Sequence, residues 1–246
     1  MQRSALVDRK TGLPPLRFLL LQAAVAALLP GFFPAARAAP LGHKGSVIVA
    51  GEFDPRWSSL TVTQSLARAT GVGPSLNWMV PQAGADGEGV DASSTQELWT
   101  LLMLTQRLRR WNGDRFQANL WAGAGAGLVT LSGEGASDGA RGSRAAWSPW
   151  MQLDWETQRL YLAGSARWFQ AEGIGRLMTS ARAGVALAPA DYNSWQPWLM
   201  VEARTMEGLE EGVEITPLIR VLHRRWLAEA GVTTGGDVRL NLSYTF

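Results

Sequence analysis

Few residues of this chain could act as a catalytic base or bind a metal ion. Among its 246 residues there is no cysteine, and there are two histidines, His43 and His223. His223 lies in the segment "LHRRW", where its neighbours are leucine and arginine. A general base must face a nucleophile or a substrate proton, and metal sites draw on His, Cys and clustered carboxylates. The sequence therefore predicts no catalytic residue, no metal site and no cofactor. A lipid-modifying hydrolase, with a serine from another strand beside His223, is the weaker alternative.

Arginine and glutamate are the residues whose spacing could carry a function. In residues 159–170, 194–205 and 213–222 they alternate with apolar residues, so charged and apolar side chains fall on opposite faces of a strand. Charged faces that point into a barrel could line a water-filled lumen, or could pair with one another and fill it. The residues predicted to line the lumen are Arg167, Arg182, Glu202, Arg204, Glu214, Arg220, Glu229 and Arg239. The same alternation adds Glu52, Arg107, Arg109, Asp154, Glu156, Arg159 and Arg176.

The elements that must position these side chains are strands, because the chain after residue 45 has a period of two and almost no helical periodicity. We expect an all-β fold, namely a transmembrane antiparallel up-and-down β-barrel of about twelve strands. Ten strands are the alternative, because 46–53 and 74–80 are short. The predicted strands are 46–53, 57–67, 74–80, 96–109, 115–130, 145–156, 159–170, 175–188, 194–205, 211–222, 225–233 and 237–246.

Two features favour a membrane barrel over a soluble sheet with one wet face. Strands of about ten residues, tilted by about 45°, are long enough to cross a bilayer. The chain also holds 12 tryptophans, many of them near predicted strand ends, where aromatic rings form girdles at the lipid–water interface. The tryptophans predicted for the girdle are Trp57, Trp99, Trp147, Trp155, Trp168, Trp195 and Trp226. The longest loops, 81–95 and 131–144, fall at one end of the barrel, which is expected to face outside.

The first 38 residues have the pattern of a secretory signal peptide. Basic residues precede the apolar segment "FLLLQAAVAALL", and Ala36-Arg37-Ala38 matches a small-residue cleavage site. This predicts general secretory export, cleavage after residue 38, and a single barrel domain over 39–246. Five of the 23 basic and one of the 21 acidic residues lie in the signal, which leaves 18 and 20. No basic surface for nucleic acid is therefore predicted.

The last residues alternate in the same way and end on an aromatic ring. Phe246 closes the chain, and Tyr244, Leu242 and Leu240 precede it at alternate positions. This pattern resembles the C-terminal sorting signal of Gram-negative outer-membrane β-barrel proteins. The resemblance implies a barrel located in the outer membrane of a Gram-negative bacterium and inserted by the barrel assembly machinery. It also implies outer-membrane lipid and lipopolysaccharide as partners, and it implies no activity.

The expected function is a passive channel for small polar or charged solutes, formed by a monomer. A closed barrel with a structural or interaction role, whose long loops meet a partner, is the alternative. One further pattern concerns the lumen: Gly123, Gly125 and Gly127 share one face of a predicted strand. Glycine in a strand makes room for a close neighbour. We therefore expect side chains of adjacent strands to occupy the lumen at this point.

Overall fold

Twelve strands form one closed antiparallel barrel in the computed structural model, which describes residues 40–81, 95–133, 142–188 and 193–246. The predicted signal peptide and most of the two longest loops lie outside the described residues. The strands are β1 (Val47–Phe53), β2 (Trp57–Ala67), β3 (Thr70–Met79), β4 (Gln96–Asn112), β5 (Phe116–Ser132), β6 (Gly142–Thr157), β7 (Leu160–Ala171), β8 (Ile174–Ala186), β9 (Gln196–Met206), β10 (Glu214–His223), β11 (Trp226–Val232) and β12 (Val238–Thr245). In the described ranges no helix is long and apolar enough to cross a membrane.

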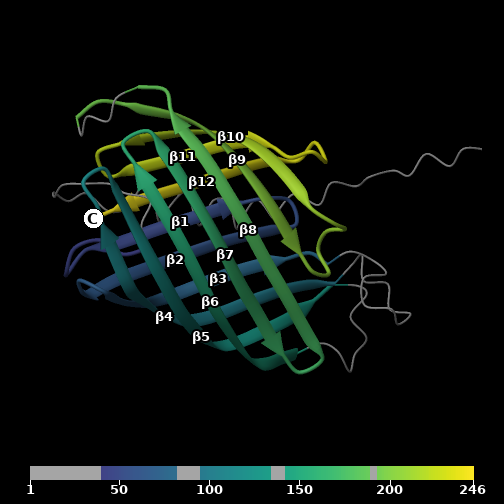
Figure 1. Cartoon of the computed structure of the whole chain (residues 1–246). Helices are drawn as coiled ribbons and strands as arrows, with labels where there is room; N and C mark the ends of the chain where they lie inside the picture. The colour runs from purple at the N-terminus through teal and green to yellow at the C-terminus, as the bar shows by residue number, and fades with distance from the viewer. Residues whose placement is uncertain (1–39, 82–94, 134–141, 189–192) are drawn as a thin grey trace, which may run out of the picture.

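Every strand pairs with its neighbours in the sequence, and β1 pairs with β12 to close the barrel. Figure 1 shows the inclined strands and the yellow C-terminal strand beside the purple β1. In this closing pair Glu52 lies opposite Asn241, and the amide of Phe246 donates to the carbonyl of Val47 at 2.7 Å. The predicted fold class and the count of twelve are confirmed, and the ten-strand alternative is wrong. Residues 74–79 of the short predicted segment 74–80 form the second part of the longer β3.

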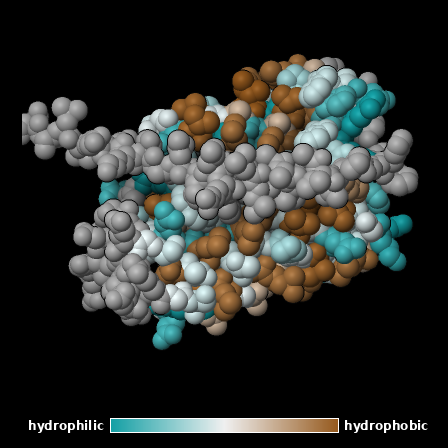
Figure 2. All heavy atoms as spheres, turned by 180° about the vertical axis from the view of Figure 1, so that it is seen from behind, coloured by the Kyte–Doolittle hydropathy of each residue, from teal (hydrophilic) through white to brown (hydrophobic). Residues whose placement is uncertain are grey.

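Alternation along each strand separates the outer surface from the interior. On β9, for example, Glu202 and Arg204 are buried in the interior, while Val201 between β8 and β10 points outward and is exposed. Figure 2 shows the result, with brown apolar residues spread over the wall of the barrel.

The antiparallel strands connect alternately at the two ends of the barrel, which we call the terminus end and the loop end. The terminus end carries both ends of the described chain, and the loop end carries the turns 54–56, 172–173, 207–213 and 233–237.

A β-bulge in β4 changes which arginines face inward. Pairing with β5 shifts register between Arg107 and Arg109, so that Arg109 lies opposite Leu120 and Arg110 lies opposite Asn119. Arg109 is exposed, and it is Arg110 whose Nε donates to the interior Asn119 at 2.8 Å. The inward position predicted for Arg109 is therefore wrong, because one extra residue reverses the alternation beyond it.

The segment before β1 folds against the interior at the terminus end. The amide of Gly42 donates to Ser65 Oγ at 3.2 Å, and the amide of Gly45 donates to the carbonyl of Ser65 at 2.7 Å. The side chain of Leu41 is buried against Gly71, where a Cβ atom would overlap it. Glycine at this position of β3 thus makes room for the N-terminal segment.

Candidate functional site

The interior holds a network of arginines and carboxylates along β1 and β8 to β12. Near the loop end Arg204 is its centre, with Nη2 at 2.8 Å from Asp54 and 3.0 Å from Glu214, and Nη1 at 3.2 Å from Glu52. Arg239, whose side chain is fully buried, contacts Glu214 at 2.8 Å. Each guanidinium can donate through several N–H groups in a fixed plane, so one arginine can bind carboxylates from different strands.

The network continues toward the middle of the barrel. Arg239 also contacts Glu202 at 2.9 Å, and Arg182 bridges Glu202 at 2.8 Å and Glu229 at 3.2 Å. Arg220 Nε donates to Glu229 at 2.5 Å. Seven of the eight residues predicted for the lumen belong to this one network, and the eighth, Arg167, does not. Charges of both signs in contact with one another give the wall little net charge.

One acidic group of the network lies at the loop end, with one carboxylate in the turn after β1, one in the turn after β9 and one at the start of β10. Asp54, Glu210 and Glu214 bring carboxylate oxygens within 4.8 Å of one another, a grouping that could hold a cation. Arg204 already contacts all three, at 2.8, 3.7 and 3.0 Å. Burial and the adjoining Glu214 raise the pKa of Glu210 to about 8. The guanidinium of Arg204, that of Arg239 at 2.8 Å from Glu214, and the carboxyl proton together offset the three carboxylates of this group.

Apolar side chains fill the rest of the loop end inside the barrel. We call the following buried residues, which come from eight consecutive strands and the turn after β9, the apolar cluster: Trp57, Met79, Trp99, Leu101, Met103, Val129, Leu131, Ala146, Phe169, Ala171, Ile174, Met178, Met206 and Leu209. Trp99 and Phe169 meet edge to face with ring centroids 5.3 Å apart. Trp99 Nε1 donates to Glu97, which in turn contacts Arg176 at 2.8 Å. The apolar cluster therefore adjoins a second buried ion pair.

Two tryptophans predicted for the girdle belong to this cluster, and that prediction is wrong for them. Trp57 and Trp99 point into the barrel, and the side chain of Trp99 has no exposed surface. Nearness to a strand end says how far along the barrel a ring lies, but only the alternation says which side it faces. Trp99 shares its parity with the inward Glu97 and Leu101, and this signal in the sequence places it inside.

The other predicted girdle tryptophans lie on the outer surface. Trp147 and Trp168 are close to the loop end, and Trp155, Trp195 and Trp226 are close to the terminus end. Trp155 is partly covered by Phe116, with centroids 6.4 Å apart.

His223 lies with this outer group at the end of β10. Its ring stacks on Trp195 at a centroid distance of 4.4 Å. Among the described residues its Nδ1 atom has no hydrogen-bond partner.

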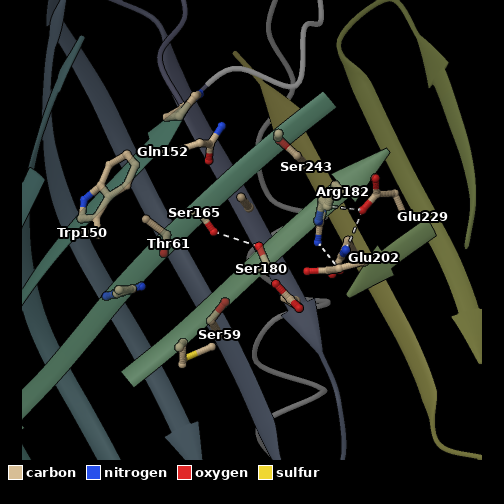
Figure 3. Close-up of a pocket in the computed structure, with 18 of the residues that line it drawn as sticks. Ser59, Thr61, Trp150, Gln152, Ser165, Ser180, Arg182, Glu202, Glu229 and Ser243 are labelled. Carbon is tan, nitrogen blue, oxygen red and sulfur yellow. Dashed lines mark hydrogen bonds and ion pairs between the residues drawn. The ribbon is translucent and has the colours of Figure 1, made fainter. Parts of the chain in front are cut away.

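Between the two ends the barrel encloses a cavity of about 410 Å³. Figure 3 shows hydroxyl groups of Ser59, Thr61, Ser165 and Ser180 facing this space, opposite the charged group formed by Arg182 with two glutamates. Pro40 lines the cavity from the N-terminal segment. Our sequence analysis missed these hydroxyls, although their inward parity along β2, β7 and β8 could have found them.

The glycines of β5 make room for side chains inside the barrel, as predicted. A Cβ on Gly123 would overlap Trp150 Nε1 and the carbonyl of Leu104, and a Cβ on Gly125 would overlap Met103 Sδ. Trp150, on the inward face of β6, thereby reaches the cavity wall. These glycines therefore shape the interior of the barrel.

No protein-family model and no curated protein matches this chain. Among solved structures, one titled KdgM porin is 11% identical, with 82% of this chain and 98% of that chain covered and a TM-score of 0.42. A KdgM porin in complex with disordered oligogalacturonate has the same identity and coverage and a TM-score of 0.44. OmpT, an outer membrane protein of Vibrio cholerae in a trimer form, is 7% identical with the same coverage and a TM-score of 0.30. The fold assignment rests on this chain's own strand order and register.

Proposed function

We propose that this chain is an outer-membrane β-barrel whose interior admits small polar or charged solutes. The observation that carries the proposal is the cavity of about 410 Å³, bounded by hydroxyl and charged side chains, inside a wall whose outer face is apolar. Leu102, for instance, is 62% exposed in the middle of β4. Water-exposed surfaces seldom carry so broad an apolar band, whereas lipid requires one.

The orientation and the partners follow from the same proposal. Outer-membrane barrels keep both chain ends in the periplasm, so the loop end faces outside. The outer tryptophans near both ends would meet the lipid headgroups and lipopolysaccharide, and Phe246 with its alternating neighbours would be read by the assembly machinery. Export would remove residues 1–38, and the barrel would act as a monomer.

A closed barrel without transport is the second candidate, and the apolar cluster is the observation that favours it. A packed apolar cross-section offers no hydrogen bonds to water or to a polar solute. Solutes would then have to pass beside the cluster, along the charged network, or after a rearrangement of the turn that carries Leu209. The backbone carbonyl of Leu209 is held by Arg56 Nη1 at 2.7 Å.

The test is single-channel conductance of residues 39–246, refolded and inserted into a planar bilayer. Stepwise currents would support the channel, and reversal potentials in a salt gradient would then give its selectivity. Insertion shown by heat-modifiable gel mobility, but without current, would favour the closed barrel. Failure to insert would refute the membrane location itself.

A further inference from the structure

Arg167 is half-buried and differs in its partners from five other arginines of the interior. Arg176, Arg182, Arg204, Arg220 and Arg239 each contact a carboxylate at 2.5 to 2.8 Å. Arg167, on the inward face of β7, has no carboxylate within 4.0 Å among the residues that the structure describes. It lines the central cavity instead.

Within the described part of the chain, the contacts of Arg167 are all with neutral groups. Nε donates to Ser148 Oγ at 3.0 Å, Nη1 donates to Asn77 Oδ1 at 3.4 Å, and Nη2 lies 3.6 Å from Met103 Sδ. The guanidinium also lies 4.3 Å from the ring centroid of Phe169. A guanidinium has five N–H groups, so these contacts leave at least two of them free to donate. A cation partly removed from water without an opposite charge is unfavourable, and a bound anion would relieve this.

Hydroxyl groups that face the same cavity supply further donors. Ser165, two residues before Arg167 on the same face of β7, shares a hydrogen bond of 2.9 Å with Ser180. Thr61 and Ser75 share one of 3.1 Å. Each hydroxyl pair uses one of its two protons internally, so the second proton remains free for a ligand. Figure 3 shows Thr61, Ser165 and Ser180 directed into the cavity.

We propose that Arg167 and these hydroxyls bind the carboxylate or phosphate group of a small solute. An oxyanion suits the site because a guanidinium donates in parallel to two of its oxygens, and the hydroxyls can donate to the others. The carboxylates of the opposite wall do not compete for Arg167, since arginines of the network hold them. A cavity of about 410 Å³ has room for such a solute, because ligand pockets commonly measure about 300–1,000 Å³.

This inference rests on the proposed function in one respect, since a solute must be able to reach the interior. The test therefore measures binding without relying on current. The full chain, exported and purified in detergent from the membrane, is titrated with inorganic phosphate and with acetate at constant ionic strength. Binding is followed by the line widths of the ³¹P and ¹³C resonances of these two probes.

Three variants decide the outcome. Arg167→Gln keeps a side chain that can bond Ser148 and Asn77 but removes the charge, and it is expected to weaken binding of both probes at least about tenfold. Ser180→Ala leaves the charge in place and is expected to weaken binding about threefold. Arg159→Gln makes the same change in the exposed turn between β6 and β7 and is expected to leave binding unchanged.

The outcomes separate this inference from the channel. Binding that is lost in Arg167→Gln and kept in Arg159→Gln supports the site, whether or not the barrel conducts. Equal binding by the parent chain and Arg167→Gln would overturn it, as would absence of binding in a barrel that does conduct. If Arg167→Gln did not fold, as judged by heat-modifiable mobility, unchanged binding in Ser180→Ala would overturn it.

Discussion

Two arginines and an asparagine of the interior converge on Glu229, and Glu229→Gln tests how much the charged network stabilises the barrel. The side chain of Glu229 is 1% exposed. It accepts hydrogen bonds from Arg220 Nε at 2.5 Å, from Asn241 Nδ2 at 2.6 Å and from Arg182 Nη1 at 3.2 Å. Glutamine keeps the size of the side chain and removes its charge.

The expected loss in the free energy of unfolding depends on which partners Arg182 and Arg220 keep in this variant. Arg182 retains Glu202 at 2.8 Å. Arg220 has no second carboxylate within 4.0 Å in the described part of the chain and keeps only the ring of Tyr161, at 4.6 Å from its centroid. Leaving one buried charge without its partner costs about 3–5 kcal/mol. Because the cation–π contact persists, we expect the free energy of unfolding to fall by about 3 kcal/mol.

The assay is equilibrium urea unfolding of the barrel in lipid vesicles, followed by tryptophan fluorescence. Glu172→Gln, in the exposed turn between β7 and β8, is the matched control and should change stability by less than about 0.5 kcal/mol. The double variant Arg220→Met/Glu229→Gln should lose less free energy of unfolding than the sum of the two single variants, by about 2 kcal/mol. The reason is that methionine at position 220 removes the buried cation that Glu229→Gln alone would leave without a carboxylate. A loss below about 1 kcal/mol in Glu229→Gln, or strictly additive single changes, would refute the reasoning.

Four other expectations concern the loop end, the apolar cluster and the outer face. The pKa of Glu210 is raised from 4.5 to about 8, so the folded barrel holds a proton that the unfolded chain releases between these values. The stability from this group is full below pH 4.5 and is lost as pH rises toward 8, and Glu210→Gln should flatten that part of the pH profile of unfolding. Trp99→Ala should lower the free energy of unfolding by about 3–5 kcal/mol in urea titrations, because it empties a fully buried position. Gly127→Ala should destabilise by about 1–3 kcal/mol, because a Cβ would overlap the carbonyl of Thr100, whereas Gly164→Ala meets no atom closer than 3.9 Å and should be tolerated. Leu102→Arg should cost about 2–4 kcal/mol in vesicles if this face meets lipid, and a neutral result would contradict the membrane location.

The fold could be predicted from the sequence because one face of most strands is apolar throughout. In β12, Val238, Leu240 and Leu242 alternate with Arg239 and Asn241, and the structure keeps this separation. Such a pattern fixes both the secondary structure and the side of the sheet, and closure then follows from strand order. The pattern failed at the bulge in β4, because a strict period of two cannot predict where one extra residue is inserted into a strand.

The interior could be predicted only in part. Charge and parity identify Arg204 and Glu202 as inward residues, but the sequence does not say which arginine lacks a counter-charge. The neutral partners that set Arg167 apart from Arg182 are distant in the chain: Ser148 is 19 positions away and Asn77 is 90 positions away. Contacts of that range depend on barrel width and register, which no local pattern encodes.

The apolar cluster has a consequence for the chain before it folds. Because Trp99, Leu101 and Met103 fill the interior while Leu98, Leu102 and Leu104 face outward, residues 98–104 of β4 are apolar on both faces apart from Thr100. A segment of seven residues, six of them apolar and none of them charged or proline, is the kind that assembles into intermolecular sheets. Until β3 and β5 cover its edges, this strand is the part of the barrel we expect to be most prone to aggregation in water. We expect a chaperone that binds the unfolded chain to bind this segment.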